Sequence, residues 1–165
     1  MTADMDQHLT GRDGPVAREP DFATVSTELM SVITALWHDI DRNGGEAAAM
    51  FFSPDATLRF SNAEFQGRTQ IEEVYANRMA RGPRVSRHVV TNLHLLEVEP
   101  RRVHAISVLL LFGEDGEAPR PTTSPAMVGD VLDEFEFAEG RWLIKSRWIR
   151  NLFIGPATEL AVPQE

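Results

Sequence analysis

The first half of the chain reads mainly as helices, because its apolar residues recur at helical spacing. After Pro20, Asp21 can cap a helix that Gly44 would end. The apolar positions of this helix are three or four residues apart and comprise Phe22, Val25, Leu29, Val32, Leu36 and Ile40. This is the clearest helix in the sequence, and its apolar stripe predicts that one face packs against a core.

Shorter elements follow this helix. The pattern predicts a second helix over Glu46–Phe52 that Pro54 closes, and then an alternating strand over Ala56–Ser61. The run Phe65–Gly67 reads as a short partner strand that turns back. We expect these elements to connect the long first helix to a third one.

The third helix has its own start and stop signals. Thr69 and Glu72 have the spacing of a capping box, and Gly82-Pro83 ends the helical pattern. The residues that this helix is expected to bury are Ile71, Val74, Tyr75 and Met79. The first half of the chain therefore predicts three helices.

The second half consists of long strand-like runs separated by turns. The four runs cover residues 85–98, 103–112, 127–137 and 142–153. Helices followed by consecutive strands predict an α+β fold with an antiparallel sheet. Strands of this length usually coil or bend, and a curved sheet closed by helices encloses a cavity in which a small ligand can bind.

Composition narrows the functional classes. The 165 residues predict one globular domain over residues 21–153, with a loose N-terminal tail at 1–20 and a C-terminal tail at 154–165. The chain lacks Cys, which excludes disulfides and thiolate metal sites and fits a cytoplasmic location. A net charge of −9 disfavours nucleic acid and anionic membranes as partners, and no apolar run is long enough to span a bilayer.

Two carboxylates near the end of the first helix are candidates for chemistry. Asp41 lies at the edge of the apolar stripe, and a carboxylate there is disfavoured by the helix dipole, which invites a compensating role. Asp39 falls nearer the stripe on an ideal wheel, so periodicity alone does not choose between them. A solvated surface Asp is an equally good interpretation.

Basic side chains on the predicted strands are further candidates. His88 can act as a general base, although a buried His that pairs with a backbone carbonyl is more common. Arg147 lies among large apolar residues where a guanidinium can meet developing negative charge, and Arg150 competes for that role. His94 is about 20 Å from His88 along an extended strand, so the two cannot share an ion and we expect no metal.

The order of these motifs resembles a known family. The helix with Asp41, the sequence Phe-Phe-Ser-Pro-Asp-Ala, the run Arg87-His88-Val-Val-Thr-Asn92 and the segment from Asp133 to Trp142 are similar to the SnoaL-like branch of the nuclear transport factor 2-like superfamily. The resemblance covers about residues 25–152. It implies a cone-shaped roll, in which a strongly curved, mostly antiparallel sheet wraps around three N-terminal helices and a deep apolar pocket, often in a homodimer.

The resemblance also implies site residues. Scytalone dehydratase, hexachlorocyclohexane dehydrochlorinase and bile-acid 7α-dehydratase pair an Asp late in the first helix with a strand His, and Asp41 and His88 match those positions. Arg147 is the closest match to the dehydrochlorinase Arg. In such a site the His takes a proton from carbon, the Asp orients the imidazole, and the Arg faces the leaving group or enolate. Strand alternation and family position together predict that the pocket is lined by Trp37, Leu58, Phe60, Val90, Asn92 and Val131.

The expected function is a cofactor-free dehydratase-type lyase or an isomerase that acts on a small, largely apolar cyclic substrate. One departure from the dehydratases is that the only Tyr, Tyr75, lies on the predicted third helix. A polyketide cyclase is a further alternative, although no residue here matches its acidic catalytic position. The same fold also forms non-catalytic ligand-binding modules and dioxygenase β subunits, so the fold alone does not establish catalysis.

Overall fold

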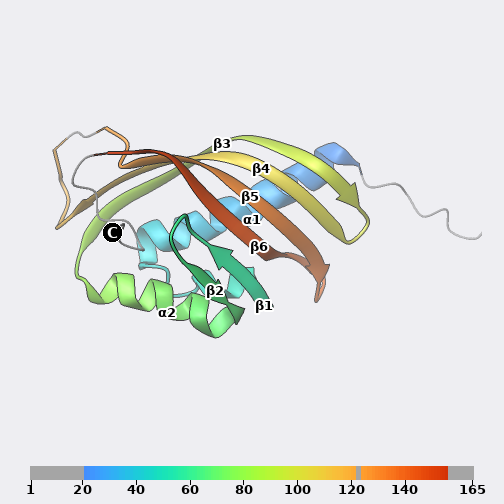
Figure 1. The fold of residues 1–165 in the computed structure, drawn as a ribbon, viewed down its shortest axis with the longest axis horizontal. Coiled ribbons are helices and arrows are strands. Elements are labelled where there is room, and N and C mark those ends of the chain that lie inside the picture. The colour runs from blue at the N-terminus through green and yellow to red at the C-terminus, as the bar shows by residue number, and fades with distance from the viewer. Residues whose placement is uncertain (1–20, 122–123, 156–165) are drawn as a thin grey trace, which may run out of the picture.

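The computed structural model describes residues 21–121 and 124–155, and shows an α+β roll in which a sheet curls around a long helix (Figure 1). The predicted N-terminal tail and nearly all of the predicted C-terminal tail lie outside the described residues. The elements are, in chain order, α1 (Phe22–Asn43), the 3₁₀ helix η1 (Ala48–Phe51), β1 (Phe52–Arg59), β2 (Glu64–Gln66), α2 (Gly67–Ala80), β3 (Arg84–Glu99), β4 (Arg102–Asp115), β5 (Met127–Ala138) and β6 (Arg141–Ile154).

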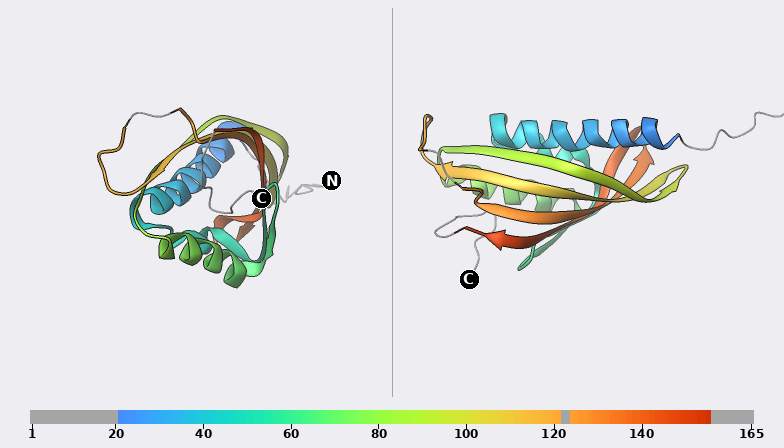
Figure 2. Two further views of the ribbon diagram at one scale, coloured as in Figure 1. Left: turned by 60° about the vertical axis from the view of Figure 1, so that its left-hand side comes forward. Right: turned by 90° about the horizontal axis from the view of Figure 1, so that it is seen from above.

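The described strands form a single sheet with the order β2-β1-β6-β5-β4-β3. Neighbouring strands are antiparallel except for β1 and β6, which run parallel. Helix α1 packs against β3, and α2 packs against β1. Figure 2 shows that the sheet bends around α1 while α2 lies along the opposite side of the roll. The predicted fold class is confirmed.

The ends of α1 follow the sequence signals. The Asp21 carboxylate accepts hydrogen bonds from the backbone amides of Ala23 and Thr24, and Gly44 ends the helix in the left-handed region at φ 69°. The buried face is rotated from the predicted one, however. Its members are Val25, Leu29, Ile33, Leu36, Trp37 and Asp39, whereas Phe22 is 61% exposed. Val32 and Ile40 of the predicted face are partly buried and pack against the core.

The predicted second helix is wrong in type and extent. It is only the single 3₁₀ turn η1, and β1 begins directly after it, so Pro54 lies inside the strand. The β1–β6 register shifts between Phe52 and Thr57. Proline is tolerated there because the interrupted ladder does not require its missing N–H group.

The predicted capping box does not open α2. The helix begins at Gly67, two residues before Thr69, with Gln66 as the N-cap residue. The side-chain oxygen of Gln70 accepts a hydrogen bond from the Gln66 amide at 2.8 Å. Gln70 therefore takes the reciprocal capping role that the sequence assigned to Glu72. The buried residues of α2 are Ile71, Val74 and Tyr75, whereas Met79 is 51% exposed.

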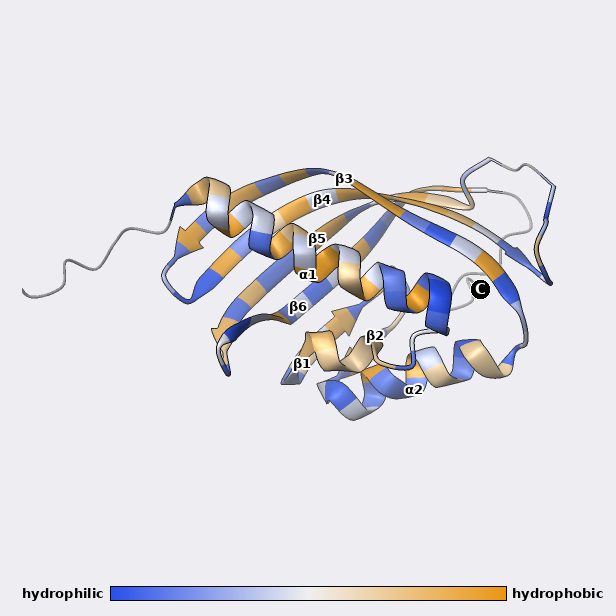
Figure 3. Cartoon of the chain, turned by 180° about the vertical axis from the view of Figure 1, so that it is seen from behind, coloured by the Kyte–Doolittle hydropathy of each residue, from blue (hydrophilic) through white to orange (hydrophobic). Residues whose placement is uncertain are grey.

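The four long strands match the predicted runs and extend them by at most three residues at either end. Apolar and polar residues alternate along them (Figure 3). On β4 and β5 the inward positions are buried, and Ala105, Asp133, Arg147 and Leu58 form one row across neighbouring strands. This row separates a packed end of the roll, which contains Phe52, Val103, Phe135 and Ile144, from the end near the C-terminus of α1.

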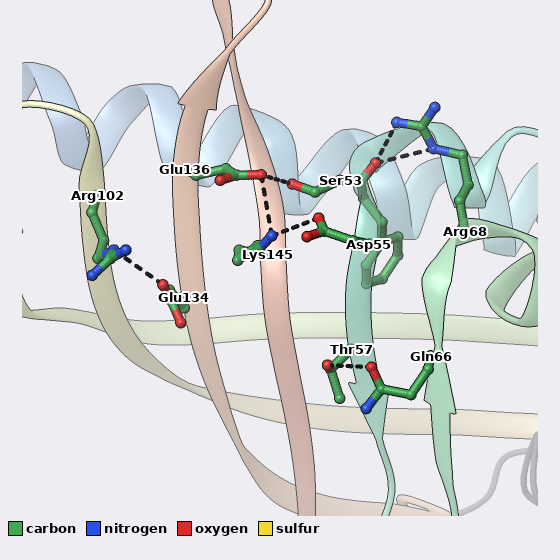
Figure 4. A network of polar contacts seen from close by, with 10 residues as sticks. Ser53, Asp55, Thr57, Gln66, Arg68, Arg102, Glu134, Glu136 and Lys145 are labelled. Carbon is green, nitrogen blue, oxygen red and sulfur yellow. Dashed lines mark hydrogen bonds and ion pairs between the residues drawn. The ribbon is translucent and has the colours of Figure 1, made fainter.

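A polar network crosses the sheet next to the packed end (Figure 4). The Ser53 hydroxyl donates to Glu136, and Lys145 forms ion pairs with Asp55 and Glu136. The side chain of Arg68 donates to the carbonyl of Phe52 at 2.6 and 3.2 Å. These contacts tie β1 to β5, β6 and α2. No helix in the described residues is long and apolar enough to cross a membrane.

Candidate active site

A cavity of about 440 Å³ opens at the end of the roll where α1 finishes. The last turn of α1, helix α2 and the inner face of the sheet all contribute to its wall. Its apolar lining comprises Trp37, Ile40, Phe60, Leu109, Leu111 and Ile149. Asp41, Ser86 and His88 lie in the same wall and supply polar groups. A mostly apolar hollow with a few convergent polar groups is typical of a small-molecule site.

Asp41 and His88 are in direct contact. Asp41 Oδ1 is 2.7 Å from His88 Nδ1, and Asp41 Oδ2 accepts a 2.8 Å hydrogen bond from the His88 backbone amide. The two residues are 47 positions apart in the sequence, so the contact depends on α1 lying against β3. Their side chains are only 8% and 11% exposed.

Three donors stabilise the Asp41 carboxylate. Burial acts to raise the pKa of Asp41, but hydrogen bonds from the His88 ring, the His88 amide and the Ser86 hydroxyl lower it below its ordinary value of 3.8. The Ser86 hydroxyl donates to Asp41 Oδ1 at 2.7 Å. Asp41 is therefore ionised at neutral pH and acts only as an acceptor.

An ionised partner determines the tautomer of His88. Nδ1 must carry the proton that Asp41 accepts, which leaves the lone pair of Nε2 available. Nε2 has no hydrogen-bond partner among residues 21–121 and 124–155. The imidazole also stacks on Trp37, with ring centroids 4.1 Å apart and planes 8° from parallel. His88 is thus held on two sides and presents one basic nitrogen, which is the arrangement that a general base needs.

The two neighbouring aspartates of α1 have different roles. Asp39 is 7% exposed, and its carboxylate accepts hydrogen bonds from the Asn43 side chain and the Ala47 amide. It closes the loop after α1. Asp41 faces the cavity instead. The structure thus resolves the choice that helical periodicity left open.

Arg147 lies deeper than predicted. Its guanidinium binds the Asp133 carboxylate through two hydrogen bonds of 2.7 and 2.8 Å, its side chain is 1% exposed, and it does not line the cavity. Burial acts to lower the pKa of Arg147, but the Asp133 charge outweighs that effect and raises it. Nη1 of Arg147 has no partner in the described part of the chain. The guanidinium carbon lies 5.3 Å from the Trp37 ring centroid.

The predicted lining residues separate into two groups. Trp37 and Phe60 line the cavity, whereas Leu58, Val90, Asn92 and Val131 do not. Leu58 and Val131 are fully buried in the hydrophobic core. Val90 is half-buried and packs against the core.

Asn92 is displaced by an irregularity in β3. Its φ is 54°, and the β3–β4 register shifts between Thr91 and His94. Simple alternation places Asn92 on the same face as His88, but the irregularity breaks the two-residue period at Asn92 itself. Asn92 is exposed. The expectation that it binds substrate therefore rested on a regularity that the strand lacks.

Sequence reasoning missed Ser86 and Tyr75 as cavity residues. Ser86 is two positions before His88 on a strand, so alternation alone indicates that they share a face. Tyr75 was expected in the buried stripe of a helix, but only the packing of α2 shows that it also lines the cavity. Burial raises the pKa of Tyr75 to about 12, so its hydroxyl stays protonated. Within residues 21–121 and 124–155, no three His, Asp or Glu side chains are grouped to hold a metal ion.

Solved structures share this architecture. A Catenulispora acidiphila protein in complex with S-DNPA is 25% identical, with a TM-score of 0.67 over 78% of this chain and 94% of that one. A Novosphingobium aromaticivorans protein provisionally named scytalone dehydratase is 18% identical, with a TM-score of 0.69 over 86% and 93%. The β subunit of a provisionally named aromatic-ring-hydroxylating dioxygenase from the same organism is 18% identical, with a TM-score of 0.70 over 86% and 98%.

The family assignment comes from the sequence itself. No curated protein matches the chain. The SnoaL-like domain model matches residues 23–148, which is most of the described chain and includes Asp41, His88 and most of the cavity wall. The chain therefore belongs to the SnoaL-like domain family.

Proposed function

We propose that the protein is a cofactor-independent lyase of the dehydratase type, or an isomerase, that acts on a small cyclic substrate. The observation that carries this proposal is the Asp41–His88 pair in the wall of a mostly apolar cavity. The carboxylate accepts a hydrogen bond from the neutral imidazole and so fixes its tautomer, and the imidazole can then act as a general base. Apolar walls favour rings and exclude water from the reacting atoms.

His88 Nε2 would remove a proton from a carbon of the bound substrate. In an elimination, the electron pair of the broken C–H bond forms a new double bond as the neighbouring leaving group departs with its own pair. In an isomerisation, the pair moves into an adjacent carbonyl to give an enolate, and the imidazolium returns the proton at another carbon. Asp41 would stabilise the imidazolium that forms in either case.

A hydrogen-bond donor is needed to stabilise the negative charge that develops on the substrate. Tyr75 lines the cavity, and its hydroxyl is protonated at every working pH, so it would donate a hydrogen bond to a substrate oxygen. Arg147 would act from beneath the cavity floor through its field, because Asp133 already occupies two of its donors. This replaces the direct contact that the family resemblance implied for Arg147.

The test begins with the ligand that the protein itself selects. Native protein is denatured, and compounds released from it are identified by mass spectrometry. The identified compound is then incubated with protein in D₂O, and deuterium incorporation and product formation are followed by mass spectrometry. General-base catalysis predicts exchange or product with the native chain and a loss of about 10²–10⁴-fold in His88→Ala.

A matched variant controls for this substitution. His104 lies on β4 in a groove that is separate from the cavity, so His104→Ala removes an imidazole without touching the site. It should retain native turnover. A His88→Ala variant that turns over the compound at the native rate would reject the mechanism. A compound that is bound but never exchanged or converted would instead identify a non-catalytic lipophilic-ligand module.

We further propose that the chain forms a homodimer through the outer face of the sheet. Alternation places Ile106, Val108, Leu110 and Leu132 on that face, and the buried Nε1 of Trp148 there has no acceptor among the described residues. Covering such a face with a second copy would bury apolar surface. Light scattering should then give twice the chain mass for the native protein and one chain mass for Val108→Lys. A native monomer at micromolar concentration would refute the proposal.

A further inference from the structure

Three arginines gather at the mouth of the cavity. Arg42 comes from the last turn of α1, Arg78 from the last turn of α2 and Arg84 from the first residue of β3, and all three line the cavity. They are thus brought together from three elements. The chain as a whole has a net charge of −9, so this cluster of guanidinium groups is opposite in sign to the overall charge and indicates a local role.

The described residues neutralise Arg42 and Arg84 only in part. Arg78 Nη2 and Arg84 Nη1 both donate to a single oxygen, Asp115 Oδ1, at 2.6 and 2.8 Å. Arg42 forms no hydrogen bond or ion pair within the described residues. Asp41 is the one carboxylate among the described residues of the cavity wall, and it is already bound to Ser86 and His88. Arg42 therefore brings an unpaired positive charge to a mouth at which Arg84 has only a share of the Asp115 carboxylate.

The position of Arg84 is built into the strand pair. Its side chain is only 13% exposed, and its guanidinium lies against the backbone of Gly113 on β4. A Cβ at residue 113 would come within 3.0 Å of Arg84 Cζ, so a side chain there would displace the guanidinium from this position. The loop that precedes β3 is also held, because the Gly116 amide donates to the Pro83 carbonyl at 2.8 Å. The guanidinium is thus ordered before any ligand arrives.

The arginine at the cavity mouth and the proposed general base lie on the same strand. Arg84, Ser86 and His88 alternate along β3 and all line the cavity. At about 3.3 Å per residue, the Cα atoms of Arg84 and His88 are roughly 13 Å apart. A ligand held at its acidic end by Arg84 would therefore place an attached ring beside His88 and Trp37.

We propose that this site takes ring compounds that carry a carboxylate, with the carboxylate bound by Arg42 and Arg84 and the ring directed toward His88. The inference rests on the proposed function and adds the substrate class. Guanidinium groups suit the planar geometry of a carboxylate, and their charge-assisted hydrogen bonds are stronger than neutral ones. The acidic end gives the substrate a fixed orientation in a cavity whose walls are otherwise mostly apolar.

Two probes with the same ring separate charge from shape. Isothermal titration calorimetry is used to compare 2-naphthoate with 2-naphthamide, which differ in the charge of one group. The native protein should bind the carboxylate about tenfold or more tightly, as expected for a charged hydrogen-bonded contact of about 1.4 kcal/mol or more. This preference should weaken as salt is added, because the mouth is exposed to solvent.

Variants then assign the preference to the mouth. Arg42→Gln, whose side chain has no structural partner among the described residues, should reduce the preference for naphthoate without affecting folding. The double variant Arg42→Gln/Arg84→Gln should abolish it. Arg102→Gln removes an exposed guanidinium that pairs with Glu134 at the far end of β4, and should keep the native preference. Circular dichroism and the melting temperature confirm that each variant is folded.

The outcomes distinguish this proposal from the proposed function. Equal affinity for naphthoate and naphthamide in the native protein, or a preference that persists in Arg42→Gln/Arg84→Gln, would overturn the carboxylate site. His88→Ala should keep the naphthoate preference, because the base does not contact the carboxylate in this arrangement. A preserved preference together with native turnover in His88→Ala would leave the carboxylate site standing and remove the general-base function.

Discussion

Two acidic–basic pairs lie at different depths in the same roll, and each contacts Trp37. The Asp41–His88 pair stands in the cavity wall, whereas the Asp133–Arg147 pair lies beneath the cavity floor with side chains 2% and 1% exposed. Both aspartates accept hydrogen bonds through both carboxylate oxygens. The difference lies in the basic partner, since His88 keeps one nitrogen available to the cavity and Arg147 does not line it.

This contrast separates groups that can perform chemistry from groups that support it. A buried ion pair loses solvation on both sides, and it need not stabilise the fold more than apolar residues of the same volume would. Removing one member, however, leaves the other charge buried and unpaired. Asp133 and Arg147 therefore have a structural role, whereas Asp41 and His88 can interact with a ligand.

The largest effect is expected at the deeper pair. Asp133→Asn leaves the Arg147 guanidinium buried without a counter-charge, and should lower the free energy of unfolding by about 3–5 kcal/mol. Urea denaturation measures this change. Asp130→Asn is the matched control, because Asp130 and Arg150 are also cross-strand partners on β5 and β6 but face outward. An exposed pair is worth less than about 1 kcal/mol. Equal losses in the two variants would contradict the distinction by depth.

At the cavity wall, activity should change more than stability. Asp41→Asn keeps the volume of the side chain but removes the charge that stabilises the imidazolium, and its amide no longer imposes one tautomer on His88. Once a substrate is in hand, kcat/KM should fall by about 10²-fold or more. Asp39→Asn, which alters the neighbouring carboxylate of the same helix, should reduce kcat/KM far less. A larger loss of kcat/KM in Asp39→Asn than in Asp41→Asn would show that the chemistry depends on Asp39 and not on Asp41.

A smaller effect is expected from the third donor to Asp41. Ser86→Ala removes one hydrogen bond, worth about 0.5–1.5 kcal/mol, and should change kcat/KM by only a few-fold to tenfold. Losing this donor raises the pKa of Asp41, so the acidic limb of the kcat/KM profile, which belongs to the coupled Asp41–His88 pair, should move to higher pH. A purely structural role for Ser86 would leave the limb in place.

The smallest expected effect concerns acid stability. The folded-state pKa of Asp41 lies below its ordinary value of 3.8, so the ionised carboxylate contributes stability above that pH, and this contribution is lost as the pH falls through the folded-state pKa. The stability difference between the native chain and Asp41→Asn should therefore shrink from neutral pH to about pH 3. Denaturant titrations at several pH values measure it. A difference that grows on acidification would show that the sign of the pKa shift is wrong.

Local pattern predicted most of the fold because most of its signals are local. The Asp21 cap, the Gly44 stop and the four long alternating runs each act within a few residues, and the structure places them as expected. The errors arose where distant partners changed the local preference. Pro54 entered β1 because an interrupted ladder with β6 accommodates it. The start of α2 is an exception, because Gln70, which caps it in place of Glu72, is only four residues from Gln66.

Residue chemistry and spacing nominated Asp41, His88 and Arg147, with family position deciding for Asp41 over Asp39. Only the tertiary structure decided what each one meets, because the packing of α1 on β3 spans 47 residues from Asp41 to His88 and no local pattern encodes it. The tertiary structure also decided how deep Arg147 lies. A two-residue period places Arg147 on the inner face of the sheet. Which row of that face forms the cavity floor depends on how α1 and α2 close the roll. The register shift that turns Asn92 outward and the convergence of Arg42, Arg78 and Arg84 likewise arise from the packing of separate elements.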